Sequence, residues 1–130
     1  MKYAIDTSVL IDHLRGYPDA VELLDHLLDE DARVLSPYVV GLEVLAGMRP
    51  GEEPATYELL DLIEWFPLAE TECDAAGALG RQYLPANEGI DTPDLLLAEL
   101  AKRQGAEVLT NNIKHFREMF PGIVAPYVYR

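Results

Sequence analysis

Short apolar runs with strand character alternate with longer helical runs along the whole chain, and this alternation constrains the fold more than any other feature. Strand composition is found at 2–5, 34–35, 65–68 and 107–109, with a last run near 123–124 or 127–129. Helix signals are found at 7–14, from residue 18 onward, and at 37–48, 55–63, 71–84, 92–104 and 115–119. Strands joined through helices of about 10 to 15 residues favour right-handed crossovers between parallel strands. The sequence therefore predicts an α/β fold with a mostly parallel sheet of about five strands and helices on both faces.

Length and composition fit one domain. The chain has 130 residues, of which 49% are hydrophobic, which is enough for one core and too little for two ordinary domains. We therefore expect a single domain over residues 1–130. Cys73 is the only cysteine, no apolar signal-peptide core precedes Asp6, and no run reaches membrane-spanning length. A cytoplasmic protein without membrane association is expected.

Four oxygen-bearing side chains stand beside apolar segments, where a core disfavours them: Asp6, Glu43, Asp94 and Asn112. Asp6 and Asn112 follow expected strands, whereas Asp94 lies in the first turn of an expected helix and Glu43 about two turns into another. The carboxyl ends of parallel strands meet at one edge of a sheet, and ligands bind there. Three carboxylates within roughly 5 Å of one another would repel by about 3 kcal/mol per pair, a cost that a divalent cation offsets. Because all the donors are oxygen, the set favours Mg²⁺ or Mn²⁺ over zinc.

Each of these residues also has a purely structural interpretation. Asp91 and Asp94 have the spacing of a capping box, and Asp6 can cap the helix that follows it. Glu43 can be a half-buried surface glutamate, and Asn112 is a common turn residue. Capping and metal binding do not exclude each other, so the prediction of a site rests on the residues as a set.

The chain carries a strong excess of acids. It has 23 Asp and Glu against 10 Lys and Arg, a formal net charge of −13, and therefore repels nucleic acid on average. A salt-rich host cytoplasm, a patch for a basic partner and ordinary acidic drift all explain the excess. Contact with nucleic acid must then come from bound cations and local bases, with Arg15, Arg81, Lys114 and Arg117 as candidates. Asp12 and the remaining acids are expected at the surface.

Four segments of the chain resemble, in the same order, the landmarks of a known family. The segments are Tyr3-Ala4-Ile5-Asp6-Thr7-Ser8-Val9-Leu10-Ile11-Asp12, Val40-Gly41-Leu42-Glu43-Val44-Leu45-Ala46-Gly47, Asp94-Leu95-Leu96-Leu97-Ala98 and Thr110-Asn111-Asn112-Ile113-Lys114-His115-Phe116. Together they resemble the PIN domain, particularly the VapC-type toxins of VapBC toxin–antitoxin systems. The resemblance runs from Lys2 to about Phe116.

This resemblance implies a PIN-like three-layer fold and a Mg²⁺- or Mn²⁺-dependent endoribonuclease, held inactive by a VapB-like antitoxin and usually a homodimer. It implies that Asp6 and Asp94 ligate the principal metal, and that Glu43 is a further ligand or acts on the attacking water. The products would carry a 5′-phosphate and a 3′-hydroxyl. Supporting roles, in orienting a carboxylate or contacting a phosphate oxygen, fall to hydroxyls at two strand exits: Thr7, Ser8 and Thr110.

One position departs from the family pattern. Many members have a fourth acid where this chain has Asn112, whose amide carbonyl can ligate but brings no charge. A second tightly bound metal is therefore disfavoured unless Asp91 substitutes. In the same segment His115 is more often a surface or core histidine than a catalytic base.

Three other readings stay open. A phosphohydrolase of the haloacid dehalogenase type also starts with a strand and an Asp, but it needs a second Asp where this chain has Ser8. An inactive PIN-like module that recognises a basic partner is consistent with Asn112, although the intact carboxylates argue against it. A solitary PIN nuclease in RNA processing would carry the same residues, and a neighbouring gene for a small basic DNA-binding protein would favour the toxin.

Overall fold

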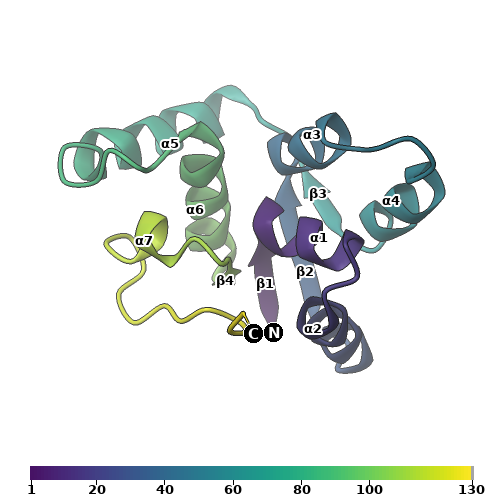
Figure 1. The fold of residues 1–130 in the computed structure, drawn as a ribbon. Helices are drawn as coiled ribbons and strands as arrows, with labels where there is room; N and C mark the ends of the chain where they lie inside the picture. The colour runs from purple at the N-terminus through teal and green to yellow at the C-terminus, as the bar shows by residue number, and fades with distance from the viewer. Residues whose placement is uncertain (130) are drawn as a thin grey trace.

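The computed structural model describes residues 1–129, which form four strands and seven helices (Figure 1). The strands are β1 (Lys2–Ile5), β2 (Arg33–Pro37), β3 (Glu64–Phe66) and β4 (Glu107–Leu109). The helices are α1 (Thr7–Leu14), α2 (Pro18–Asp29), α3 (Tyr38–Ala46), α4 (Glu53–Leu60), α5 (Glu70–Tyr83), α6 (Thr92–Gln104) and α7 (Ile113–Phe116). The expected alternation of strands and helices is confirmed.

All neighbouring strands are parallel, in the order β3-β2-β1-β4. Ala4 of β1 pairs with Leu35 of β2 on one side and with Val108 of β4 on the other. The chain builds β2 and β3 on one side of β1 and reaches the other side only after α5 and α6. The strand order therefore reverses at β1, which is the place where ligands bind in open α/β sheets.

The expected fifth strand is absent from residues 1–129, so the prediction of a strand near 123–124 or 127–129 is wrong. The C-terminal segment contains Pro121 and Pro126, which have no backbone N–H to donate to a ladder beside β4. Side-chain hydrogen bonds to α1 hold this segment instead.

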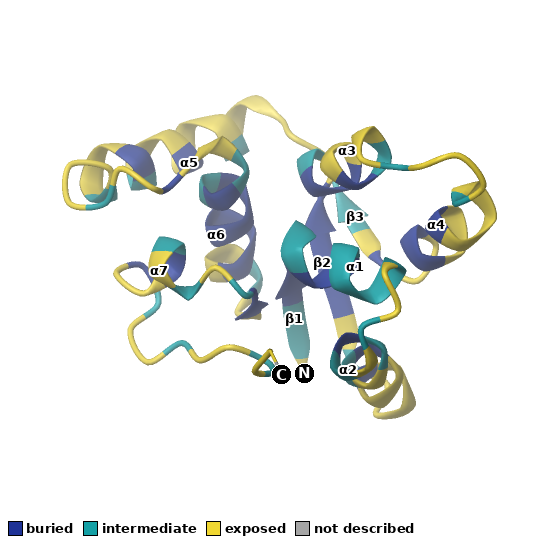
Figure 2. Cartoon of the chain, in the orientation of Figure 1, coloured by how far each residue is buried: buried dark blue, intermediate teal, exposed yellow. Residues whose placement is uncertain are grey.

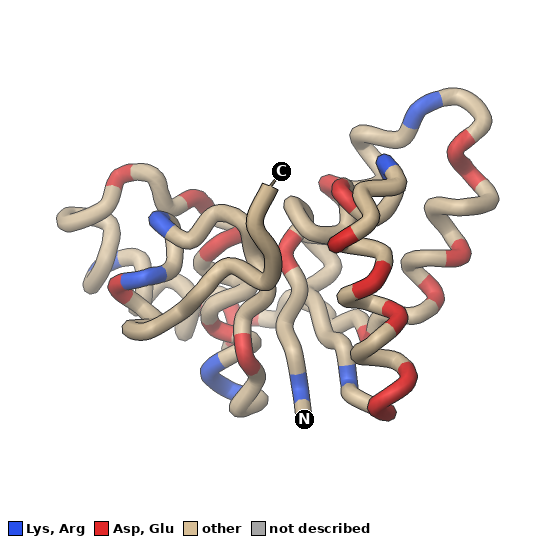
Figure 3. Tube along the Cα trace, turned by 60° about the horizontal axis from the view of Figure 1, so that its bottom comes forward, with Lys and Arg blue, Asp and Glu red and all other residues tan. Residues whose placement is uncertain are grey.

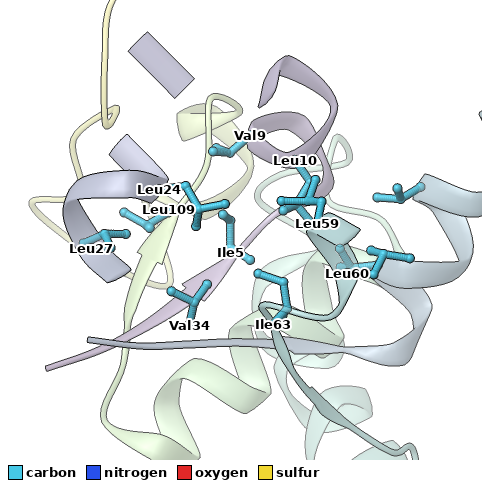
Figure 4. Packing of buried hydrophobic residues seen from close by; sticks show 12 residues of the cluster. Ile5, Val9, Leu10, Leu24, Leu27, Val34, Leu59, Leu60, Ile63 and Leu109 are labelled. Carbon is cyan, nitrogen blue, oxygen red and sulfur yellow. The ribbon is translucent and has the colours of Figure 1, made fainter. Parts of the chain in front are cut away.

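Both faces of the sheet are buried, because successive residues of a strand point to opposite sides. Ile5, Val34 and Leu109 belong to a hydrophobic cluster with residues of α1 to α4 (Figure 4). Their neighbours Ala4, Leu35 and Val108 belong to a second cluster that α6 and α7 complete. Figure 2 shows that α6 is mostly buried and α5 mostly exposed. The three-layer α/β arrangement is thus confirmed.

Local signals explain where two long helices begin and end. Pro18 is the first residue of α2, where its missing N–H costs nothing. A capping box of Asp91 and Asp94 starts α6, and Gly105, with a φ of 64°, ends it. The expected helices at 37–48 and 55–63 are found at Tyr38–Ala46 and Glu53–Leu60.

None of the helices in the described part of the chain has the length and apolar character that a membrane span requires. The extent of the domain, residues 1–130, stays a prediction.

Candidate active site

The edge of the sheet at the carboxyl ends of β1 and β4 brings the first group of candidate residues together. The backbone N–H of Asp6 donates to the carbonyl of Leu109 (2.9 Å), which extends the pairing of the two strands by one residue. Asp6 and Thr110, the residues that follow these strands, consequently lie side by side, and both are buried.

Three donors fix the Asp6 carboxylate. Its Oδ2 accepts hydrogen bonds from the hydroxyls of Thr110 (2.6 Å) and Ser8 (3.1 Å), and its Oδ1 accepts from the backbone N–H of Thr7 (2.8 Å). The bond from Thr7 also makes Asp6 the N-cap of α1. The structural and the functional interpretations of Asp6 therefore apply to the same side chain.

Asp94 likewise combines a cap with a place in the site. Its backbone N–H donates to Asp91 Oδ1 (3.1 Å), and its Oδ2 accepts from the backbone N–H of Asp91 (3.0 Å), which completes the expected capping box. The residue is only 5% exposed. Burial raises the pKa of Asp94 to about 7; the backbone N–H of Asp91 opposes this, and the charges of Asp91 and Asp6 add to it. This part of the site therefore favours an added positive charge.

Glu43 and Asn112 lie at the exposed rim. Glu43 projects from α3, and its Oε1 accepts a hydrogen bond from the Thr7 hydroxyl (2.8 Å). The backbone N–H of Asn112 donates to Thr110 Oγ1 (3.0 Å), and the Asn112 side chain makes no capping bond to α7. Glu43 is thus on the solvent side of its helix, although its neighbours in sequence are apolar.

A single hollow of about 270 Å³ connects these side chains. Its lining is Asp6, Thr7, Ser8, Glu43, Asp91, Pro93, Asp94, Asn112 and His115. Every candidate site residue is therefore on this hollow except Thr110, which lies buried behind Asp6. Within residues 1–129, no three His, Cys, Asp or Glu side chains are already grouped as a metal site. A larger hollow of about 660 Å³, between α2 and the C-terminal segment, has no such carboxylate set.

His115 is closer to the carboxylates than the sequence suggested. Its Nδ1 lies 3.0 Å from Asp94 Oδ2, an ion-pair distance without hydrogen-bond geometry. The loop before α6 approaches the other side of the ring, where a Cβ on Gly89 would come within 3.4 Å of the imidazole. In the sequence, the only indication that His115 lies near Asp94 is its position in the Thr110–Phe116 segment, three residues after Asn112.

Among the residues that the structure describes, the hollow is lined by four carboxylates and by no Lys or Arg. Figure 3 shows Asp and Glu along most of the chain, with the fewer Lys and Arg scattered among them. Arg15, one of the candidate bases, pairs with Glu52 (2.8 Å). Lys114 is exposed on α7, between Asn112 and His115. A nucleic-acid phosphate at this edge would therefore need a cation.

Comparison with known proteins identifies the family. The model of the PIN domain matches residues 3–119. Ribonuclease VapC19 of Mycobacterium tuberculosis is 37% identical over 123 residues, which cover 95% of this chain and 98% of that protein. Ribonuclease VapC10 of the same organism is 31% identical over 95% of this chain and 91% of its own length. The chain belongs to the PIN-domain family. Within that family it is a homologue of the VapC ribonucleases of VapBC toxin–antitoxin systems, which confirms the resemblance.

Solved structures have the same fold. A toxin–antitoxin complex from Klebsiella pneumoniae contains a chain with a TM-score of 0.78 at 22% identity, with coverage of 96% of this chain and 98% of that one. VapBC2 from Rickettsia felis, bound to a DNA fragment from its promoter, matches with a TM-score of 0.71 at 24% identity, over 96% and 97% of the two chains.

Proposed function

We propose that this protein is a VapC-type endoribonuclease, the toxin of a toxin–antitoxin pair, and that it cleaves RNA phosphodiester bonds with a divalent cation and an activated water. Full-length homology to VapC ribonucleases supports the reaction class. The observation that supports the mechanism is the hollow, which is lined by the buried Asp6 and Asp94 and the exposed Glu43. It lies at the end of β1, where the order of the strands reverses.

The cation is Mg²⁺ or Mn²⁺, and its ligands are Asp6 and Asp94, with Glu43 as a further ligand or as the group that orients the attacking water. PIN-domain nucleases typically use divalent metals, and the oxygen donors here suit a hard cation. The raised pKa of Asp94 supports a cation at this position, because a bound cation removes the free-energy cost of ionising a buried carboxyl. When bound, the cation offsets phosphate charge and makes a water molecule more acidic.

The chain's own residues hold these ligands in place. Ser8 and Thr110 orient the Asp6 carboxylate through their hydroxyls, and Asp91 orients Asp94 through the capping box. Thr7 holds Glu43 at the rim of the hollow through a hydrogen bond, and both side chains line the hollow.

Asn112 contributes to the same site without adding charge. Its side-chain carbonyl would hold the cation or a water molecule, and the missing charge leaves a second tightly bound cation less favoured than in members with a fourth acid. Asp91 also lines the hollow and would be the replacement for that charge.

The partners follow from the toxin role. Structural neighbours of this chain include toxin–antitoxin complexes, and we propose a VapB-like antitoxin, with basic segments that suit a net charge of −13. The substrate is RNA, the site of action is the cytoplasm where RNA is available, and the toxin is a homodimer.

The test is cleavage of a structured RNA by protein purified free of its antitoxin. Cleavage should occur with Mn²⁺ or Mg²⁺, stop with chelator, and leave 5′-phosphate ends. Asp6→Asn should abolish it, whereas Asp61→Asn, the same change at an exposed position just after α4, should not. Cleavage in chelator, or an active Asp6→Asn protein, would contradict the mechanism. Tight binding of an antitoxin without any cleavage would instead favour an inactive binding module.

A further inference from the structure

A compact cluster of polar side chains fastens the C-terminal segment to the body of the protein. We call it the tyrosine clasp: Asp12 of α1, Asn111 after β4, and Tyr127 and Tyr129 near the C-terminus. Asp12 Oδ2 accepts hydrogen bonds from the hydroxyls of Tyr127 (2.6 Å) and Tyr129 (2.5 Å) and from Asn111 Nδ2 (3.0 Å). Asp12 is thus a half-buried hub, and the expectation that it is a surface acid is wrong.

Every hydrogen at the centre of the clasp has an acceptor. Each tyrosine gives its hydroxyl hydrogen to Asp12. Asn111 Nδ2 has two hydrogens, which are shared among three acceptors at 3.0 Å: Asp12 Oδ2 and the two tyrosine oxygens. Burial, with further contributions from Asp12, raises the pKa of Tyr129 to about 12 and that of Tyr127 as well, so both hydroxyls stay donors. The rings also pack on Tyr17, with centroid distances of 5.6 and 5.3 Å.

The clasp continues into the active site through the backbone of one residue. The backbone N–H of Asn111 donates to Ser8 Oγ (3.1 Å), and the Ser8 hydroxyl donates to Asp6 Oδ2 (3.1 Å). Asn111 also stands between Thr110, which donates to Asp6, and Asn112, which lines the hollow. Hydrogen bonds on the side chain and on the backbone N–H of Asn111 therefore connect Tyr127, through Asn111 and Ser8, to the Asp6 carboxylate.

We propose that Asp12, Asn111 and Tyr127 are positioning residues for the reaction, and that the C-terminal segment is a strap that holds the Thr110–Asn112 turn against Ser8. This turn follows the end of β4, so hydrogen bonds that involve side chains, rather than backbone pairing between strands, hold it in place. When the strap is loosened, the Asn111 N–H separates from Ser8, the Ser8 hydroxyl is free to rotate, and Asp6 loses one of its three donors. The effect on turnover rests on the proposed ribonuclease function, whereas the effect on the turn does not.

The first arm of the test measures the turn directly, by hydrogen exchange of backbone amides in the metal-free protein by NMR. The variants are Tyr127→Phe combined with Tyr129→Phe, which keep both rings, and Tyr57→Phe on α4 as the matched control. We expect the Asn111 amide to exchange at least about tenfold faster in the double variant, with Val108 in β4 unchanged. Unchanged exchange at Asn111, or an equal change at Val108, would overturn the proposal.

The second arm measures RNA cleavage and Mn²⁺ affinity. We expect the double variant to lose about tenfold in kcat, the range found for groups that orient metal ligands, with KM for RNA unchanged and Mn²⁺ affinity lowered. In an Asn111→Ala background the tyrosine changes should cost nothing more, because the link is already broken. Independent, additive losses would show that the tyrosines do not act through Asn111. If the unmodified protein cleaves no RNA, the proposed function fails while the exchange experiment still decides the clasp.

Discussion

Replacing Asp94 by Asn should stabilise the metal-free protein at alkaline pH. Burial first, and the charges of Asp91 and Asp6 in addition, raise the pKa of Asp94 from 3.8 to about 7. A carboxyl with a raised pKa binds its proton more tightly in the folded chain, so the free energy of unfolding falls as the pH rises from about 4 to about 7. Above that range both states are ionised and the penalty is complete.

The size of the penalty follows from the two pKa values. Their difference corresponds to at most about 4 kcal/mol, and screening by salt lowers this, so we expect a gain of about 2 to 4 kcal/mol at pH 8.5. At pH 5.5 the gain should be roughly half as large, since the carboxyl is protonated in the folded state but not in the unfolded state. An Asn side chain keeps a carbonyl that can accept the N–H of Asp91, so the cap is retained.

The assay is urea unfolding at pH 5.5 and 8.5 in chelator, with Glu99→Gln as the matched control. Glu99 is also buried on α6, and its replacement removes the same charge, but it pairs with Arg103 (2.7 Å), so its loss should destabilise. Saturating Mn²⁺ should shrink the advantage of Asp94→Asn, because a ligand at 100 times its Kd stabilises the unmodified protein by about 2.7 kcal/mol. An Asp94→Asn protein that is no more stable at pH 8.5, or equally more stable at both pH values, would refute the reasoning.

Three further substitutions test other parts of the structure. Thr110→Val removes the 2.6 Å hydrogen bond to Asp6 and should lower kcat for RNA cleavage by about 10- to 100-fold with a normal far-UV spectrum; an unchanged kcat would show that this hydroxyl does not position Asp6. Gly41→Ala places a Cβ 3.2 Å from the Trp65 ring and should cost about 1 to 3 kcal/mol in urea unfolding, whereas no loss would mean that the ring moves freely. Gly105→Ala forces a side chain into a φ of 64° and should cost about 1 kcal/mol, measured as a lower Tm.

The layers of the fold and the meeting of the candidate residues at one hollow could be predicted because their signals are local. The strands are short apolar runs, successive residues of a strand such as β1 pack into different layers because of the two-residue period, and the capping residues Asp91 and Asp94 lie three residues apart. Parallel strands then fix the edge at which Asp6 and Asn112 meet. The four carboxylate and amide positions needed no long-range information beyond this rule.

The predictions that were wrong concern features that depend on residues far apart in the sequence. Asp12 contacts Tyr127 and Tyr129, which are 115 and 117 residues away, and nothing near Asp12 in the sequence indicates those contacts. The C-terminal segment has the β-branched and aromatic composition of a strand, but Pro126 and its side-chain ties outweigh that propensity. Glu43 faces solvent although its neighbours are apolar, because helical geometry, rather than adjacency in sequence, decides which side a residue takes.

Parallel titrations of Mn²⁺ binding and RNA cleavage test most directly whether Asp6, Asp94 and Glu43 form a catalytic cation site. Binding is followed by electron paramagnetic resonance and cleavage by initial rates, on the same protein with increasing Mn²⁺. We expect the two curves to reach half-saturation at the same Mn²⁺ concentration, and both to disappear in Asp6→Asn and Asp94→Asn. Cleavage that is complete before Mn²⁺ binds, or Mn²⁺ bound with full affinity by both variants, would contradict this assignment.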